Sequence, residues 1–332
     1  MANLTGVDLS SSSGVSMIPM VYASGVVVNI LLICICNAVN LVVVPKLNDI
    51  KDTEKVFYLS LSITDLLVGI TLLPLVPSAV TRTWIFGKLA CNVHGILMTI
   101  IPICSTCVFV FLNLDRFVAI FQPMKYHQLV TKRRAVILLS GFALMVFTFL
   151  LICVTFVSHF DGIVVFQLET FVCSVVLSRG KVAFVLTTFA FSFWLPAILL
   201  LVGYIQIVRV AWQHVRKIHQ AVTAPKTPDG ERCARRPGEN IPPVKQRRAT
   251  GTKSIALMVV VTGSFSLCWL PFSIIESYLL IHPDGIPTAL RLSAHWLPQT
   301  SSWRNAVTFL VLKKSYRQMV QKCFSCRQST SD

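Results

Sequence analysis

Six long apolar blocks dominate this 332-residue chain and decide how it can fold. Each holds about 20 or more mostly hydrophobic residues, enough for one helix to cross the hydrocarbon core of a bilayer. They lie at roughly 20–44, 56–80, 92–121, 135–158, 182–212 and 254–281. Only 13% of the residues are charged, about half the share of a soluble domain, so most of the surface must face something other than water. We therefore expect an all-α integral membrane protein.

A seventh candidate span, roughly 288–312, is less apolar because Arg291, His295, Gln299 and Arg304 interrupt it. The distribution of charge decides whether it crosses the membrane. With seven spans and the N-terminus outside, 24 of the 30 Lys and Arg residues fall in cytoplasmic segments, where basic residues concentrate in membrane proteins. With six spans the basic C-terminal tail would lie outside. The sequence therefore predicts a seven-transmembrane helix bundle.

This topology divides the chain into three regions. Residues 1–18 form an extracellular tail with a glycosylation pattern at Asn3, and residues 19–312 form the transmembrane domain. Residues 313–332 are cytosolic. The cytosolic loop at about 213–251 is rich in charge and proline, so we expect it to be flexible. The N-terminal segment shows no cleavable secretory signal, and the first span is expected to direct insertion.

Four cysteines near the membrane surfaces have expected roles. Cys91, at the outer end of the third span, and Cys173, in the second outer loop, are the two that can meet in an oxidising compartment, which predicts a disulfide. Cys323 and Cys326 follow the seventh span, where apolar and basic residues recur with helical spacing. That stretch predicts a short amphipathic helix in the membrane interface. Both cysteines are juxtamembrane and are candidates for palmitoylation.

Three polar motifs stand out within the spans, where ionisable groups are costly and usually functional. Asp65 lies near the middle of the second span. The motif Asp115–Phe117 (Asp-Arg-Phe) ends the third span at its cytosolic edge. The sixth span carries Cys268–Pro271 (Cys-Trp-Leu-Pro), in which Pro271 must kink the helix beside a bulky indole. A kink at this place is suited to act as a pivot.

These motifs, in this order across seven spans, resemble the class A, or rhodopsin-like, G protein-coupled receptors over nearly the whole chain. Asn37 resembles the first-helix Asn of that family, Asp65 its second-helix Asp, and the pair Cys91 and Cys173 its disulfide. Trp84–Gly87 is similar to its first outer-loop motif, and Pro196 matches its fifth helix. The resemblance implies that the activation-switch residues are Asp115, Arg116, Tyr204, Phe265, Trp269, Pro271, Asn305 and Phe309.

The chain also departs from the pattern of that family. The seventh-helix Asn-Pro-x-x-Tyr reads Asn305–Phe309 (Asn-Ala-Val-Thr-Phe), which lacks both the proline and the tyrosine hydroxyl. Phe117 replaces the tyrosine of the third-helix motif. Gly251 occupies the level where many relatives carry the sixth-helix acid that pairs with the third helix. Phe142 or a neighbour stands where the fourth helix usually has Trp. These changes bear on signalling efficiency and basal activity rather than on the fold.

The resemblance implies a ligand pocket between the helices near the outer face. The matching positions are Met98, Thr99, Pro102, Thr188, Ser192, Trp269, Phe272, Ser273, Glu276, His295 and Gln299. Met98 stands where the amine-binding branch of the family carries an Asp, so a monoamine would lose its principal ion pair. Glu276 is the single acid among these positions. It either serves as a displaced counter-ion for a cationic ligand or faces the outer water.

A sodium site is the one cofactor that the resemblance implies. Asp65, Ser105, Ser302 and Asn305 match the positions that surround the ion in the family, and oxygen ligands around a carboxylate suit a hard cation. The alternative is a buried polar network satisfied by water. Arg304 matches no family position. It either extends to the interface along its long side chain or pairs with a carboxylate such as Asp65.

The sequence therefore predicts a plasma-membrane receptor that binds an extracellular small molecule or peptide and activates a heterotrimeric G protein through helix rearrangement. Membrane lipid is a further expected partner of the basic loop ends. Nucleic acid is not, because the net charge of +16 is that of cytosolic membrane-protein segments. An enzyme is not expected either. The alternatives are a non-signalling decoy receptor, which Asn305–Phe309 favours, and a membrane transporter, for which no inverted repeat is found.

Overall fold

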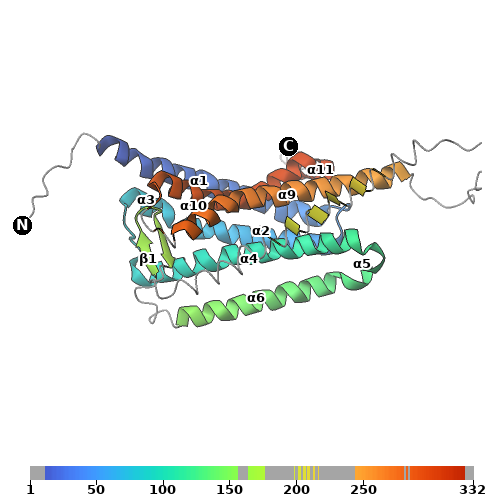
Figure 1. Ribbon diagram of the computed structural model, residues 1–332, viewed down its shortest axis with the longest axis horizontal. Coiled ribbons are helices and arrows are strands. Elements are labelled where there is room, and N and C mark those ends of the chain that lie inside the picture. Colours follow the sequence, from blue (N-terminus) through green and yellow to red (C-terminus); the bar gives the residue numbers. More distant parts are fainter. Residues whose placement is uncertain are drawn as a thin grey trace, which may run out of the picture.

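The computed structural model is a bundle of long helices that run side by side (Figure 1). It describes residues 12–155, 164–175, 244–279 and 285–325, together with His282 and isolated positions between 198 and 216. The helices are α1 (Ser12–Val43), the short 3-10 helix η2 (Val44–Lys46), α2 (Asp52–Leu72), α3 (Leu75–Thr81), α4 (Gly87–Phe121), α5 (Pro123–Leu129), α6 (Lys132–Thr155), α9 (Val244–Leu279), α10 (Thr288–Leu312) and α11 (Lys314–Ser325). Two short strands, β1 (Val164–Gln167) and β2 (Val172–Val175), form a hairpin. Most of the predicted fifth span lies outside the described residues.

The other predicted spans coincide with helices, except that the second one is broken. The stretch predicted at roughly 56–80 is covered by two helices, since α2 ends at Leu72 and α3 begins at Leu75. Pro74 lies between them and has no amide hydrogen to donate to a helical bond. Leu73 N instead donates to Ile70 O in a tighter turn, at 3.2 Å. The predicted second span is therefore confirmed as the membrane-length stretch Asp52–Thr81, with its helix interrupted at this proline.

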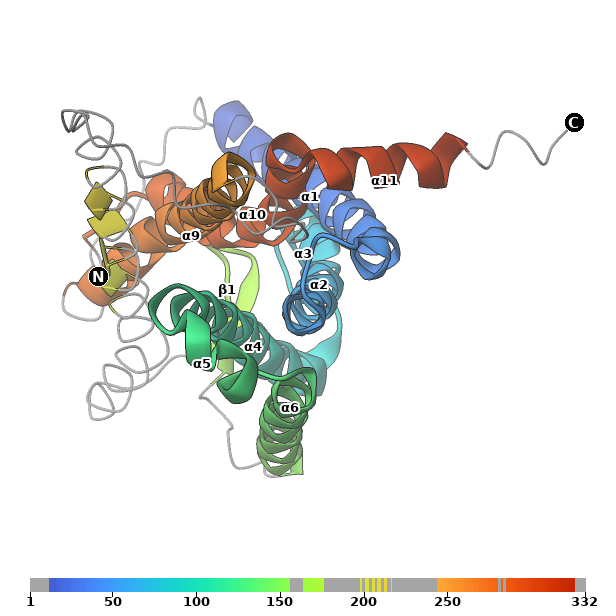
Figure 2. The same cartoon turned by 90° about the vertical axis from the view of Figure 1, so that its right-hand side faces the viewer.

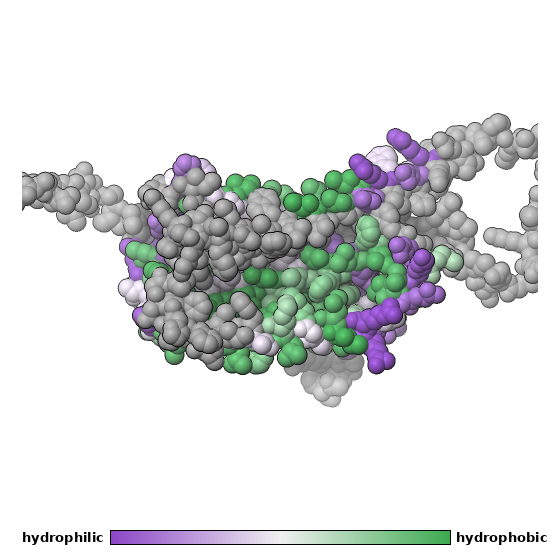
Figure 3. Space-filling model, turned by 60° about the horizontal axis from the view of Figure 1, so that its bottom comes forward, coloured by the Kyte–Doolittle hydropathy of each residue, from purple (hydrophilic) through white to green (hydrophobic). Residues whose placement is uncertain are grey.

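Apolar side chains cover the outside of the bundle. Among the described residues, three helical stretches are long and apolar enough to cross a membrane: Pro19–Lys46, Asp52–Thr81 and Gly87–Ala119. Helix α6 exposes large hydrophobic side chains such as Leu144 and Phe147. Figure 3 shows hydrophobic residues across the middle of one face and hydrophilic ones gathered at its ends. This is the distribution that a bilayer requires.

Two apolar clusters hold the described helices together. The larger joins the cytosolic halves of α1, α2, α4, α9 and α10, and Phe109, Phe265, Phe309 and Tyr316 lie in it. The second joins the outer halves of α1, α2 and α4 with β2. Lipid tails are as apolar as these side chains, so their dense packing and the polar contacts between helices determine how the helices associate.

Helix α11 leaves the bundle sideways, as the end-on view shows (Figure 2). This confirms the predicted helix after the seventh span, beginning at Lys314. Three contacts hold its start to the first helix and the loop that follows. Tyr316 donates to Asn40 at 2.7 Å, while Ser315 donates to Asp49 at 2.7 Å and Lys313 pairs with Asp49 at 3.3 Å. Burial of Tyr316 raises its pKa to about 12, so the phenol remains a donor.

Candidate functional site

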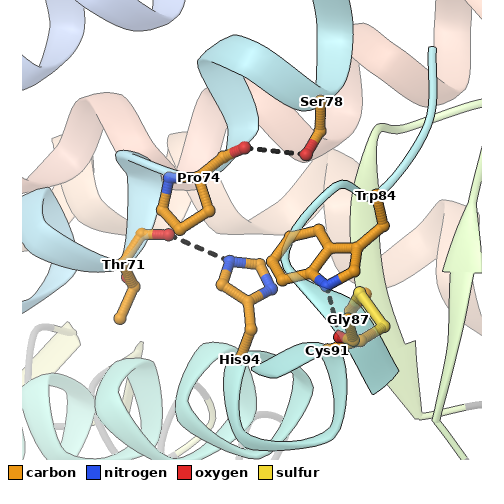
Figure 4. Close-up of a disulfide and its surroundings, with 8 residues drawn as sticks. Thr71, Pro74, Ser78, Trp84, Gly87, Cys91 and His94 are labelled. Atoms are coloured by element: carbon orange, nitrogen blue, oxygen red, sulfur yellow. Dashed lines mark hydrogen bonds between the residues drawn. A yellow bond between two sulfur atoms is a disulfide. The ribbon is translucent and has the colours of Figure 1, made fainter. Parts of the chain in front are cut away.

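At the outer end of the bundle, a disulfide joins Cys91 of α4 to Cys173 of β2, as predicted (Figure 4). The hairpin itself was not predicted. It lies close to α4, since a Cβ added to Gly95 would come within 2.6 Å of a Val164 methyl group. Next to the disulfide, the His94 ring lies between Thr71 O, to which its Nε2 is 3.0 Å away, and the indole of Trp84. These contacts fix the hairpin over the outer ends of the helices.

A chain of rings leads inward from the outer half of α10 to the centre of α9. His295 packs edge-on against Phe272 with ring centres 5.0 Å apart, and Phe272 packs edge-on against Trp269 at 5.9 Å. His295 Nε2 lies 2.9 Å from Glu276 Oε1 and joins the two helices. The Glu276 side chain is 24% exposed. Glu276 therefore does not simply face outer water, which was one of the two expectations from the sequence.

Of the other predicted pocket residues, some pack against apolar side chains and others bury a polar group. Met98 belongs to the outer apolar cluster, and the Thr99 hydroxyl donates to its own helix at Gly95 O, 2.9 Å away. Ser273 is fully buried and likewise donates to Leu270 O at 2.8 Å. Gln299 is buried, and its Oε1 has no hydrogen-bond partner among the described residues. Pro102 lies inside α4, whereas Thr188 and Ser192 lie outside the described residues.

A second ion pair ties the hairpin to α10. Arg291 Nη1 pairs with Glu169, which lies in the turn between β1 and β2, and Arg291 Nη2 lies 3.4 Å from Gln167 Oε1. The Glu169 side chain is 53% exposed, so solvent screens the pair and its net contribution to stability is small. It does place an acid and a base at the outer mouth of the bundle. This ion pair was not predicted from the sequence.

The predicted sodium ligands meet in the middle of the bundle. Asp65 is 2% exposed, and Ser105 Oγ of α4 donates to its Oδ1 at 3.3 Å. Ser302 and Asn305 approach the same carboxyl group from α10. Asp65 Oδ2 has no hydrogen-bond partner among the described residues. One carboxylate surrounded by hydroxyl and amide oxygens is a donor set that suits a hard cation.

The predicted aromatic switch residues Phe265, Trp269 and Phe309 all pack in or against the larger apolar cluster. Phe265 stacks on Phe109 with ring centres 4.6 Å apart and also contacts Trp269 at 5.8 Å. Phe309, which replaces the tyrosine of the seventh-helix motif, packs edge-on against Tyr58 at 4.7 Å and is 2% exposed. Its ring is therefore used in packing. Pro271 lies within α9 as predicted, and Tyr204 lies outside the described residues.

Helix α10 also differs from expectation at Arg304. Its Nη1 lies 2.9 Å from Cys268 Sγ of α9, so the guanidinium neither reaches the interface nor pairs with Asp65. Both expectations for Arg304 are wrong, because the side chain extends toward α9 within the bundle. The same helix contains a buried proline, Pro298, and has Ala306 where the family has its proline. The family's seventh-helix proline is thus absent, as the sequence predicts, and α10 has a proline eight residues earlier instead.

Three asparagines of α1 form side-chain hydrogen bonds to other helices. The sequence motifs identified only one of the three. Asn37, predicted from the resemblance, donates to Ser302 O at 3.1 Å. Asn29 accepts from the Trp303 indole at 2.9 Å, and Asn40 accepts from Tyr316 as described above. All three amides are buried. A buried amide every few residues on one face of an apolar span was the available signal.

At the end of the bundle where α5 lies, five side chains form what we call the Arg116 cluster: Lys51, Glu54, Asp115, Arg116 and Tyr126. Arg116 donates to Asp115 Oδ2 through Nη2 at 2.7 Å and Nε at 3.0 Å, and pairs with Glu54 of α2. Tyr126 of α5 donates to Asp115 Oδ1 at 2.8 Å. Lys51 lies over the Tyr126 ring, 3.8 Å from its centre. Only Asp115 and Arg116 were predicted.

Burial and neighbouring charges shift the pKa values of Tyr126 and Lys51 in this cluster. Burial, and then the hydrogen bond to Asp115, raise the pKa of Tyr126, so the phenol stays protonated and donates. Burial and repulsion from Arg116 lower the pKa of Lys51, while the nearby carboxylates oppose that change. Lys51 therefore lies close enough to Arg116 and the two carboxylates to belong to the same electrostatic unit.

Comparison with known proteins bears on the nature of this bundle. The family model for the 7 transmembrane receptor (rhodopsin family) matches residues 36–307. The chain belongs to this family. It is accordingly a G protein-coupled signalling receptor of the plasma membrane that crosses the bilayer several times, with an extracellular ligand and a G protein as partners. It is not an enzyme.

Individual relatives are distant. The chain is 28% identical to the histamine H2 receptor of Homo sapiens over 286 residues, covering 84% of this chain and 72% of that protein. It is 27% identical to G-protein coupled receptor 161 of Xenopus tropicalis over 313 residues, covering 90% and 59%. The crystal structure of squid rhodopsin superimposes with a TM-score of 0.71 at 17% identity, covering 95% of this chain and 88% of that one. That likeness supports the seven-helix fold.

Proposed function

We propose that this receptor lies in the plasma membrane with its N-terminus outside and binds a small extracellular molecule between the outer halves of α4, α9 and α10. The excess of basic residues in the expected cytoplasmic segments supports this orientation, and so does the Asn3 glycosylation pattern, although Asn3 lies outside the described residues. In this orientation the Arg116 cluster is at the cytosolic end, where it can meet the G protein.

The pair Glu276 and His295 carries the proposal for the ligand. It joins α9 to α10 at 2.9 Å, directly above the chain of rings that ends at Trp269. A ligand that replaces His295 as the partner of Glu276 would act on both helices and on the segment of α9 that contains Pro271. Met98 offers no charge on α4. We therefore propose a ligand with a cationic or hydrogen-bond-donating group that binds Glu276, and an apolar part that packs on Phe272.

A substitution of Glu276 tests this proposal. We expect Glu276→Gln to lower the potency of an activating amine about tenfold or more, since one tenfold step corresponds to about 1.4 kcal/mol of lost binding free energy. The measurement is nucleotide exchange on a G protein in cells exposed to a panel of small amines, with surface expression matched. Glu169→Gln, which removes the exposed acid of the outer hairpin, is the matched control and should respond like the wild type. Equal potency on both variants would contradict the proposed contact.

We further propose that Asp65, Ser105, Ser302 and Asn305 hold a sodium ion. The unpartnered Asp65 Oδ2 supports this, because a buried carboxylate oxygen without a partner is costly and a cation would satisfy it. When bound, the ion would supply positive charge in the middle of the bundle. It would join α2, α4 and α10 through their own side chains.

Sodium should accordingly stabilise the purified receptor against heat. We expect its melting temperature to be higher in sodium chloride than in N-methylglucamine chloride of the same ionic strength, and agonist affinity to be lower. Asp65→Asn should abolish both differences because the carboxylate ligand is gone. Asp52→Asn, which removes an exposed acid from the start of the same helix, should keep them. A sodium response of equal size in Asp65→Asn would remove the site.

A non-signalling receptor is the second candidate, and the motif Asn305–Phe309 favours it. Phe309 is packed against Tyr58 and provides no hydroxyl. A flat nucleotide-exchange response to amines, peptides and lipids, with the protein present at the cell surface, would support this candidate over a signalling receptor.

A further inference from the structure

The contact between Arg116 and Glu54 links the third membrane helix to the second. Arg116 lies near the C-terminal end of α4, and Glu54 lies in the first turn of α2. Their side chains are 10% and 11% exposed, so water screens this pair far less than an exposed one. Separating them would leave two buried charges without their partner, which is unfavourable. The contact is therefore a strong restraint on where the guanidinium points.

A neighbouring acid shows that this contact is specific. Asp52 and Glu54 both lie in the first turn of α2, where any acid is favourable near the helix N-terminus. Asp52 is 65% exposed and pairs loosely with Lys55 at 3.5 Å. Glu54 points inward and is 8% exposed. Two acids with the same helix-end role thus have different environments, and only Glu54 contacts Arg116.

Charge balance in the Arg116 cluster explains why Glu54 is needed. Asp115 uses Oδ1 to accept from Tyr126 and Oδ2 to accept from Arg116. Lys51 adds a second positive charge beside the same groups. Glu54 supplies the second negative charge. On α9, the level at which many relatives carry an acid is occupied by Gly251, which has no side chain to offer.

We propose that Glu54 is the acid that holds this receptor inactive, by keeping Arg116 against α2 and out of reach of the G protein. The proposal rests on G protein coupling, which belongs to the family. The restraint acts on Arg116 alone, because the acid is on α2 rather than on α9. Ligand-driven displacement of α9 would leave it intact, so the release of Arg116 is a separate step. Replacement of Glu54 by a neutral residue removes the restraint without any ligand.

Ligand-free signalling tests the proposal directly. We expect Glu54→Gln to raise basal nucleotide exchange about threefold or more at matched surface density, because it removes the charge that favours the inactive population. Asp52→Asn removes the same charge from the same helix turn and should leave basal exchange unchanged. Glu54→Asp keeps the charge on a shorter side chain and should give an intermediate value. It serves as the test if Glu54→Gln does not reach the surface. Basal exchange that is unchanged or lower in these Glu54 variants would overturn the proposal.

Measuring how tightly a G protein peptide binds distinguishes the Glu54 restraint from G protein coupling itself. Purified receptor in nanodiscs is titrated with a peptide of the Gα C-terminus in the absence of any ligand. Tighter binding to Glu54→Gln than to the wild type, by about threefold or more, is the expected result. Equal affinity for both chains would overturn the restraint while leaving G protein coupling in place. Failure of every Gα peptide to bind either chain would overturn both.

Discussion

Replacing Cys173 with serine is expected to remove most of the folded receptor from the cell surface. The disulfide from Cys91 closes a segment of 82 residues and fixes the hairpin against α4 at Gly95. Loss of a native disulfide typically costs about 2–5 kcal/mol. The hairpin also carries Glu169, so its contact with α10 should be lost with it. The measurement is surface staining of an N-terminal tag, together with the melting temperature of the purified protein.

Two further variants make this prediction specific. Cys107→Ser changes a free, half-buried cysteine of α4, the helix that also carries Cys91. It should leave surface staining near the wild-type level. The double variant Cys91→Ser and Cys173→Ser should be no worse than Cys173→Ser alone, because one bond is lost in either case. Normal staining of Cys173→Ser would show that the hairpin is held by its other contacts.

Arg116→Met is expected to have the second large effect, on stability and signalling together. Methionine fills similar space but leaves Glu54 and Asp115 buried without their cation. Removing one partner of a buried ion pair costs about 3–5 kcal/mol. We therefore expect a large fall in melting temperature, and no G protein activation even where protein reaches the surface.

Combining this change with Glu54→Gln separates the two effects. The double variant removes the uncompensated charge as well, so part of the lost stability should return. Signalling should remain absent, because no guanidinium is available to the G protein. If the melting temperature of the double variant is the sum of the two single changes, Glu54 and Arg116 are energetically independent, which would contradict the ion pair described above.

Features that follow from repeating sequence patterns were predictable. Contacts between segments far apart in the sequence were less so. Hydropathy located the spans, and the distribution of Lys and Arg gave their number. The interruption of the second span at Pro74 was not predicted, because hydropathy alone does not distinguish one helix from two consecutive ones. The hairpin β1–β2 was missed because strands of four residues carry little periodic signal.

Among the site residues, too, some could be predicted from the sequence and others depend on how the helices pack. The disulfide was predictable because two cysteines share the outer surface. Glu54 was not, since an acid in the first turn of a helix usually has a simple capping role, and its inward direction depends on how α2 packs on α4. Arg304 was misjudged for a similar reason. Its contact with Cys268 depends on the distance between α9 and α10, and no local sequence pattern predicts that distance.

The position of Pro298 gives the seventh helix an unusual mechanical property. Pro298 cannot donate a hydrogen bond to the preceding turn, so α10 has its weak point there. From Pro298 to Leu312 the helix has no further proline and is about 20 Å long, at about 1.5 Å per residue. Most of α10 is therefore a stiff lever with its hinge near the ligand end. A small rotation beside His295 would therefore act at the far end on the contacts of Phe309 with Tyr58 and of Tyr316 with Asn40.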